Sequence, residues 1–187
     1  MKILSSLLFC CLLAAGSVQA QSLSVVPSSP VVAPGDTFSI DIVVTDLGDT
    51  AASTLGTYDL SVAFDPSLVK VFGITFGNGL DVFDLGSLFT VSSGFGTISL
   101  YELSFDSIDD LVALQPDAFT LATLTFKAIS LGTTPFDVSV TAFGDAFGDS
   151  LPVTLTGSSV AVVPEPQTLA LMLAGLGLIG FAARRNG

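Results

Sequence analysis

The 187-residue sequence contains no histidine and no tryptophan, and both of its cysteines, Cys10 and Cys11, lie within the first twenty residues. Without histidine, a chain cannot build a Ser-His-Asp or Cys-His nucleophile or a histidine-bearing zinc site. Because the remainder of the chain has no cysteine, disulfide bonds cannot hold it together. The sequence therefore predicts a fold that is stabilised by its own hydrophobic core.

Basic residues are also scarce, with five Lys and Arg against 17 Asp and Glu. Residues 21–162 contain sixteen of these acids and only Lys70 and Lys127, which gives that segment a net charge of −14. Binding to nucleic acid needs a cationic surface, and two lysines cannot supply one. Nucleic acid is therefore excluded as a partner, and the acidic excess serves the solubility of a chain rich in Phe, Leu and Val.

Paired carboxylates, as in glycoside hydrolases, are the catalytic device that this composition leaves open. Nearly all acidic residues lie in turn-like stretches, where solvated Asp is common. Sugar-processing sites use aromatic faces, and the chain has no Trp and only two Tyr, Tyr58 and Tyr101, either of which could instead pack within a sheet. We therefore expect that the protein is not an enzyme.

The amino-terminal segment, residues 1–20, has the order of a secretory signal peptide. Lys2 is followed by an apolar run from Ile3 to Gly16 and then by the small-x-small tripeptide Val18-Gln19-Ala20. The run is shorter than the ~20 residues of a membrane-spanning helix. The sequence predicts export, with cleavage between Ala20 and Gln21.

The carboxy-terminal segment, residues 163–187, combines three features in a fixed order. They are Pro164-Glu165-Pro166, an apolar run from Leu169 to Ala183, and Arg184-Arg185. As a helix the run would be about 22 Å long, shorter than the ~30 Å of bilayer hydrocarbon. We expect a hydrophobic helix that engages the membrane at least transiently as a transmembrane segment, with the arginines on the cytoplasmic side.

This tail resembles the PEP-CTERM sorting signal of Gram-negative bacteria that make exopolysaccharide. In that family a membrane protease, an exosortase, recognises and cuts the tail after export. The resemblance implies that the export machinery and an exosortase are partners and that the protein reaches the cell surface or is secreted. It also implies that the sorting residues are Pro164, Glu165, Pro166, Arg184 and Arg185. The alternative is a permanent tail anchor preceded by a stiff linker.

Between the two ends, residues 21–162 alternate apolar and polar side chains with the period of β-strands, as in 38–44 and 58–64. Pro34-Gly35 and Asp65-Pro66 predict turns, and residues 107–114 are the best candidate for a short helix. The pattern predicts an all-β fold of two antiparallel sheets in a sandwich. Further strands are expected at 23–26, 69–76, 89–91, 97–103, 122–128, 136–140, 153–155 and 160–163.

Three segments of this region, 32–38, 58–69 and 121–128, resemble the cohesin-like module, a jelly-roll sandwich related to certain carbohydrate-binding modules. The resemblance spans about residues 22–162. It implies a non-catalytic binding or scaffolding role through a sheet face, with an extracellular protein or the extracellular matrix as partner. The alternative is a carbohydrate-binding module for extracellular polysaccharide.

Clusters of aspartate offer oxygen atoms of the kind that calcium prefers. Calcium needs six to eight oxygens, and no cluster has the spacing of an EF-hand loop. Solvated turns account for such clusters equally well. We therefore expect no metal or cofactor, with calcium as the one ion left open. The clusters are Asp46 and Asp49; Asp106, Asp109 and Asp110; and Asp145 and Asp149.

Overall fold

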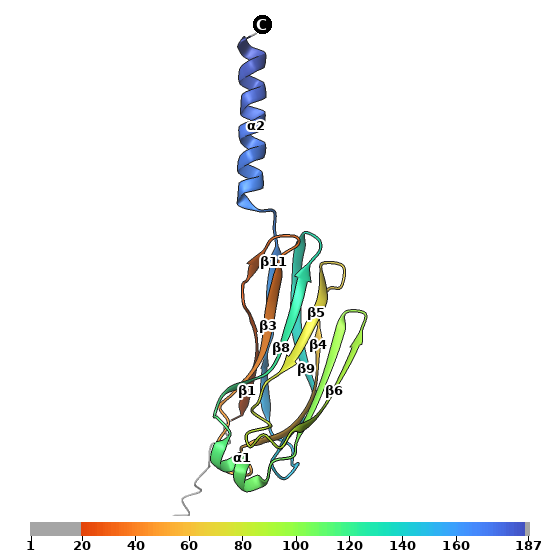
Figure 1. Ribbon diagram of the computed structural model, residues 1–187, viewed down its shortest axis with the longest axis vertical. Helices are drawn as coiled ribbons and strands as arrows, with labels where there is room; N and C mark the ends of the chain where they lie inside the picture. The colour runs from red at the N-terminus through yellow and green to blue at the C-terminus, as the bar shows by residue number, and fades with distance from the viewer. Residues whose placement is uncertain (1–19, 186–187) are drawn as a thin grey trace, which may run out of the picture.

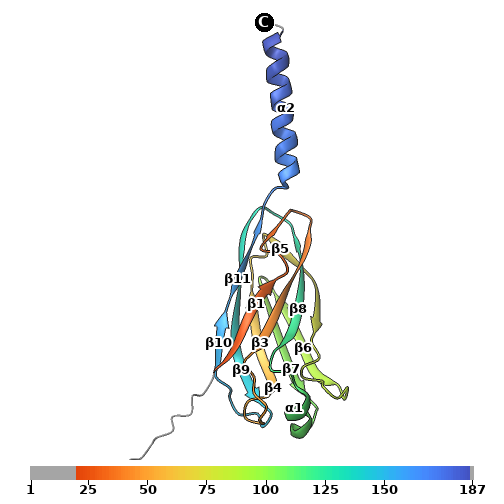
Figure 2. The same ribbon diagram turned by 90° about the vertical axis from the view of Figure 1, so that its left-hand side faces the viewer.

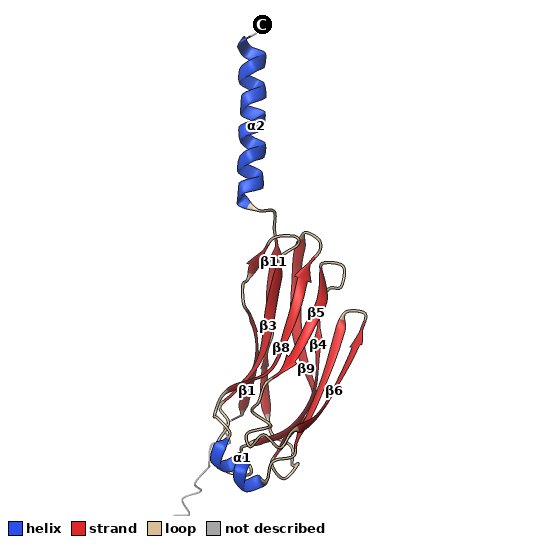
Figure 3. Cartoon of the chain, in the orientation of Figure 1, coloured by secondary structure: helices blue, strands red, loops and turns tan. Residues whose placement is uncertain are grey.

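The computed structural model describes residues 20–185, which form eleven strands and two helices (Figures 1 and 3). The predicted signal peptide, up to residue 19, lies outside the described residues. The strands are β1 (Gln21–Pro27), β2 (Val31–Val32), β3 (Thr37–Thr45), β4 (Leu55–Ala63), β5 (Val69–Phe76), β6 (Ser87–Gly94), β7 (Thr97–Ser104), β8 (Phe119–Ala128), β9 (Gly132–Asp145), β10 (Val153–Thr156) and β11 (Ser158–Val162). The helices are α1 (Ile108–Leu114) and α2 (Pro166–Arg185).

The strands form two sheets that face each other. One sheet has the order β10-β1-β3-β8-β5 and the other the order β2-β11-β9-β4-β7-β6. Neighbouring strands are antiparallel except for the short parallel pairs β1–β10 and β2–β11. The predicted all-β, two-sheet sandwich is therefore confirmed.

The core lies between the sheets and is built by the alternation seen in the sequence. In β4, Leu60 and Val62 point inward and are fully buried, while the intervening Ser61 lies on the outer face. The centre of the core is an aromatic group, defined here as Phe38, Phe64, Phe126 and Phe136. The ring of Phe126 lies 5.0 to 5.8 Å from the other three ring centroids. Aromatic packing thus joins strands of both sheets.

Both predicted turns are present. Gly35 has a φ of +95°, the conformation that glycine adopts at no steric cost, and the Asp36 amide donates to the Ala33 carbonyl at 3.1 Å. At the second turn, Asp65 accepts hydrogen bonds from the Ser67 amide and hydroxyl at 2.8 and 2.6 Å. These two bonds hold the pKa of the Asp65 carboxyl below its ordinary value.

Two strands differ most from the sequence prediction, and others, such as β6 at Ser87–Gly94 against the expected 89–91, differ in their bounds. The strand expected at 136–140 runs from Gly132 to Asp145, because β11 pairs with its first part, residues 132–136, and β4 pairs with the rest, residues 137–145. Strand β2 was not predicted, since two residues cannot show an alternating pattern. The short helix was correctly predicted: it begins after Ser107, whose hydroxyl accepts from the Asp110 amide.

The two ends of the described chain leave the sandwich at opposite ends (Figures 1 and 2). Strand β1 begins at the end that carries α1, whereas α2 extends away from the other end. Helix α2 contains the predicted apolar run. No helix within residues 20–185 is long and apolar enough to cross a membrane, so the prediction of a transmembrane helix is not supported. The apolar part of α2 is short because Arg184 and Arg185 occupy its last turn.

Candidate binding surface and sorting tail

The outer face of β9, β4, β7 and β6 is a broad surface rich in serine and threonine, which we name the hydroxyl face. Tyr58, Leu60 and Val62 point into the core, so the residues between them point outward. The Ser61 and Ser99 hydroxyls are 2.9 Å apart across β4 and β7, and the Ser139 hydroxyl donates to the Ser61 carbonyl at 3.4 Å. The hydroxyl face consists of Thr57, Asp59, Ser61, Ala63, Leu88, Thr90, Ser92, Thr97, Ser99, Tyr101, Leu103, Asp137 and Ser139.

This composition suits contact with a large partner better than the capture of a sugar. Tyr101 is the one aromatic residue of the hydroxyl face, because Tyr58 is fully buried and cannot stack on a ligand. Short serine and threonine side chains let a partner approach the sheet closely. The hydroxyl face can therefore bind through hydrogen bonds and shape over a wide area.

A buried carboxylate lies beneath this surface. Glu102 is 1 % exposed and points inward from β7, in phase with the core residues Ile98 and Leu100. It accepts hydrogen bonds from the Tyr58 hydroxyl at 2.8 Å and from the Ser87 hydroxyl at 2.7 Å. The sequence analysis missed this residue. Its signal was the single Glu of residues 21–162, placed on the inward phase of an alternating strand.

Burial is the main physical influence on this pair. Loss of solvation raises the pKa of the Glu102 carboxyl, and the two hydroxyl donors offset this only in part. The Tyr58 pKa is also raised, first by burial and then by the nearby Glu102 charge. Because Glu102 is enclosed by protein and bonded to two side chains, it holds three strands together and is not placed to reach a substrate.

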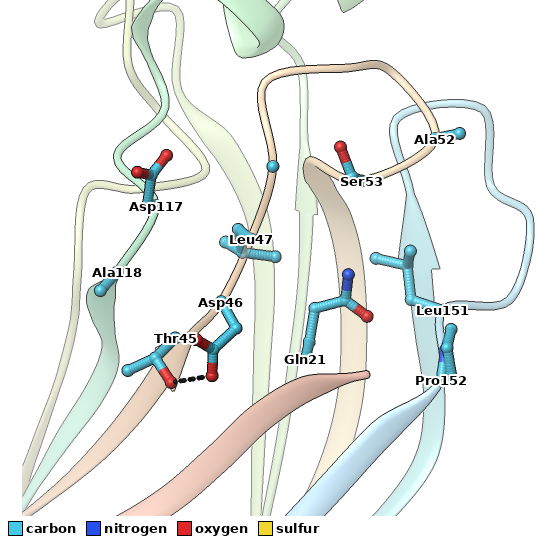
Figure 4. A pocket seen from close by; sticks show the side chains of 11 residues that line it. Gln21, Thr45, Asp46, Leu47, Ala52, Ser53, Asp117, Ala118, Leu151 and Pro152 are labelled. Atoms are coloured by element: carbon cyan, nitrogen blue, oxygen red, sulfur yellow. Dashed lines mark hydrogen bonds between the residues drawn. The ribbon is translucent and has the colours of Figure 1, made fainter. Parts of the chain in front are cut away.

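A cavity lies at the end of the sandwich where β1 begins (Figure 4). It has a volume of about 630 Å³ and is lined by Gln21, Asp46, Ser53, Asp117 and Leu151 among others. The Gln21 side chain is 4 % exposed and enters the cavity, while the Asp46 carboxylate accepts from the Thr45 hydroxyl at 3.0 Å. Its polar groups come from the start of β1, the end of β3 and the loops that hold Asp46, Ser53 and Asp117.

The position of Gln21 bears on the predicted signal cleavage. The Gln21 backbone amide donates to the Pro152 carbonyl at 3.1 Å, and Gln21 pairs with Val153 at the start of β1. Ala20, by contrast, is exposed. A protease that cuts between Ala20 and Gln21 would act most easily before β1 joins the sheet.

Carboxylates of two aspartate clusters hold loop backbone, Asp106 that of a second loop and Asp145 that of its own. Asp106 accepts from the Val82 amide at 2.7 Å, and Asp145 accepts from the Phe147 and Asp149 amides at 2.8 and 2.9 Å. In the part of the chain that the structure describes, no group of three or more acidic, histidine or cysteine side chains could hold a metal ion. The expectation of no metal or cofactor, with calcium as the one ion left open, stays untested.

The sorting residues follow directly on the last strand. The Val163 amide donates to the Val32 carbonyl at 2.9 Å, which is the last backbone hydrogen bond before the tail. Pro164 and Glu165 are exposed, and Pro166 begins α2, a position where proline's fixed φ suits a helix. Arg184 and Arg185 end α2 and are exposed. The Pro-Glu-Pro tripeptide and the arginine pair thus lie at opposite ends of α2.

Residues 162–186 match the family described as the PEP-CTERM protein-sorting motif. The chain carries a PEP-CTERM sorting motif. This motif indicates an exported protein that is sorted at the cell envelope of a Gram-negative bacterium. No curated protein matches the chain.

The sandwich is similar to solved cohesin domains. A non-cellulosomal cohesin from the archaeon Archaeoglobus fulgidus has a TM-score of 0.61 and 14 % identity, and the match covers 81 % of this chain and 97 % of that one. A type I cohesin from Clostridium thermocellum, solved in complex with a dockerin, has a TM-score of 0.63 and 15 % identity over 78 % and 100 % of the two chains. A type II cohesin domain from Acetivibrio cellulolyticus has a TM-score of 0.62 and 15 % identity over 76 % and 95 %. The sandwich therefore has a cohesin fold.

Proposed function

We propose that this protein is an exosortase substrate of the cell envelope or extracellular matrix, and that its sandwich is a non-catalytic module that binds another protein. One observation carries the proposal: a PEP-CTERM motif follows directly on the last strand of a cohesin fold. The export machinery and an exosortase are then partners in sorting. The sandwich is the part that acts after sorting.

The geometry of the junction suits removal of the tail. Hydrogen bonds to β2 hold the chain as far as Val163, and the exposed Pro164 and Glu165 come immediately after it. A protease that cuts within the tripeptide would therefore leave every strand of the sandwich in place. The released product would be a complete folded domain.

We place the binding site for a protein partner on the hydroxyl face. Similar folds from Clostridium thermocellum and Acetivibrio cellulolyticus were solved in complexes with dockerins, which supports a protein rather than a sugar as partner. The buried position of Tyr58 removes one of the two tyrosines that a carbohydrate site could use. Glu102, whose carboxyl pKa is raised by burial, gives no support to catalysis because it is enclosed by protein.

Replacing Pro164, Glu165 and Pro166 by alanine in the native host tests the sorting function. We expect the variant to keep its tail and to accumulate in the cell, while the wild type is processed and released. A Gln167→Ala variant, which changes the adjacent position, should be processed like the wild type. If the triple variant is processed at the wild-type rate, the tripeptide is not the recognised element.

The binding function has a separate test. The double variant Ser61→Arg and Ser99→Arg places two large charges at the centre of the hydroxyl face, and Thr125→Arg makes the same kind of change on the outer face of the other sheet. Chemical cross-linking in host cultures should yield a protein adduct with the wild type and Thr125→Arg but not with the double variant. The proposed binding site is wrong if the adduct survives in the double variant.

A further inference from the structure

Strand β6 is the edge of its sheet and is exposed along nearly its whole length. Among residues 20–185 it pairs with β7 alone, so one side of its backbone has no strand partner. Seven of its eight residues are exposed. Free amides and carbonyls along such an edge are a template for pairing with another strand.

The inner side of β6 is apolar and uncovered. Phe89 and Val91 are 58 % and 40 % exposed, although their cross-strand neighbours Glu102 and Leu100 are each 1 % exposed. The cause is the unequal width of the sheets, because the facing sheet ends at β5. From β5, the Phe76 ring reaches Phe89 with 4.9 Å between ring centroids. Phe89 and Val91 therefore form an uncovered apolar strip along the edge.

This edge lacks the devices that usually prevent pairing. Residues 85–101 contain no charged residue and no proline, in a sandwich whose net charge is −14. Two copies of so acidic a chain repel each other over most of their surfaces. They can approach without facing like charges at β6, where the next acid along the hairpin, Glu102, is buried.

The strand is also complementary to itself. An antiparallel pair of β6 strands related by a two-fold axis at Thr90 would place Phe89 of each copy opposite Val91 of the other. Aromatic residues opposite β-branched ones, and threonine opposite threonine, are favourable cross-strand pairs. Because Phe89 and Val91 lie on the same side of the sheet, the apolar strips of the two copies would lie side by side and cover part of each other.

We propose that β6 pairs in antiparallel fashion with β6 of a second copy, which joins the two six-stranded sheets into one continuous sheet. The contact is isologous, as in most protein dimers, and closes without leaving a free β6 edge. It leaves most of the hydroxyl face uncovered and presents two such faces together, which strengthens the binding of a repeated partner.

Cysteine cross-linking tests the register. Residues 21–187 contain no cysteine, so Thr90→Cys introduces a single thiol into this part of the chain. In the Thr90-centred register the two thiols would lie directly opposite each other, with β-carbons about 4.5–5.5 Å apart. Full-length protein in which Cys10 and Cys11 are replaced by serine, kept in mild detergent and oxidised with copper-phenanthroline, should give a covalent dimer. Thr154→Cys, at the exposed edge strand β10, should stay monomeric. Equal cross-linking of both variants would overturn the proposal.

Sedimentation velocity of the full-length protein in the same detergent tests the contact without cross-linking. The wild type should sediment as a dimer, and Thr90→Lys as a monomer, because two lysines would face each other across the axis. Thr154→Lys adds the same charge elsewhere and should remain dimeric. A monomeric wild type, or a Thr90→Lys protein that stays dimeric through α2 or another face, would contradict the proposal. A different protein that co-purifies by binding to β6 would also contradict the proposal.

Discussion

At the scale of single residues, Glu102 gives the clearest prediction. Burial raises its pKa in the folded state above the ordinary value of 4.5, so protonation favours folding. Its stabilising contribution is complete below that ordinary value and is lost as the pH rises through the folded-state pKa. Glu102→Gln keeps the shape and can still bond Tyr58 and Ser87, so we expect it to be more stable than the wild type at pH 7 by about 1 kcal/mol.

Urea unfolding of both proteins between pH 4 and pH 8 measures this effect. The difference in free energy of unfolding between Glu102→Gln and the wild type should shrink as the pH falls toward 4. Comparing two proteins at each pH cancels the general effect of neutralising the other acids. A difference that stays constant with pH would show that Glu102 titrates as it does in the unfolded chain.

Gly77 provides a second test at the same scale. A β-carbon at this position would collide with the backbone carbonyl oxygen of Thr120. Gly77→Ala should therefore lower the free energy of unfolding by about 1–3 kcal/mol, the usual cost of overpacking. At Gly73 the nearest atom, in Thr125, would be 3.8 Å away, so Gly73→Ala should stay within about 0.5 kcal/mol of the wild type. Equal thermal melts for both variants would refute the close approach at Gly77.

The residue scale also shows what sequence alone can predict. The turns at Gly35 and Asp65 were predictable because each is made by a few consecutive residues. Glu102 was not, because its environment depends on Tyr58 and Ser87, which lie 44 and 15 residues away in the chain. Long-range neighbours decide whether a carboxylate on a strand is a surface charge or a buried one.

At the scale of elements, the aromatic group should account for much of the contact between the sheets. Phe126 is fully buried on β8 and packs against Phe38, Phe64 and Phe136. Phe126→Ala should lower the free energy of unfolding by about 3–5 kcal/mol. Phe72→Ala removes a ring that is 77 % exposed and should cost less than about 0.5 kcal/mol.

Urea denaturation distinguishes these outcomes, since both changes remove the same number of atoms. If the two variants lose equal stability, the centre of the core does not lie at Phe126.

Elements were predicted better than their arrangement. Alternating side chains indicate a strand wherever one face is buried, and they located β3, β4, β7 and β8 from the sequence. They do not indicate which strand lies beside which, so the order of the sheets and the open edge at β6 became visible only in the structure. Strand β2 escaped prediction because two residues carry no period.

At the scale of the whole molecule, the acidic charge predicts a dependence on salt. The full chain has a net charge of −12, and repulsion among its acids opposes the compact state. Raising sodium chloride from about 10 to 150 mM shortens the screening length from about 30 to 8 Å. The melting temperature should rise by a few degrees, since about 1 kcal/mol corresponds to 2–4 °C for a chain of this size. A melting temperature that stays constant or falls with salt would contradict this expectation.

The sorting motif at the carboxy-terminal end was readable from sequence because its features are local. Pro164-Glu165-Pro166, the apolar run and the arginine pair are consecutive in the sequence. A binding surface is different, since the hydroxyl face gathers residues from four strands that are separated along the chain.

The central claim is that the protein is exported and then loses its PEP-CTERM tail. Intact mass spectrometry with terminal peptide mapping, on protein recovered from the medium and the membranes of the native host, tests it most directly. We predict a released species that begins at Gln21 and ends between Pro164 and Pro166, and a loss of this species in a host without its exosortase. A mature protein that retains Arg184 and Arg185 in every fraction would contradict the claim.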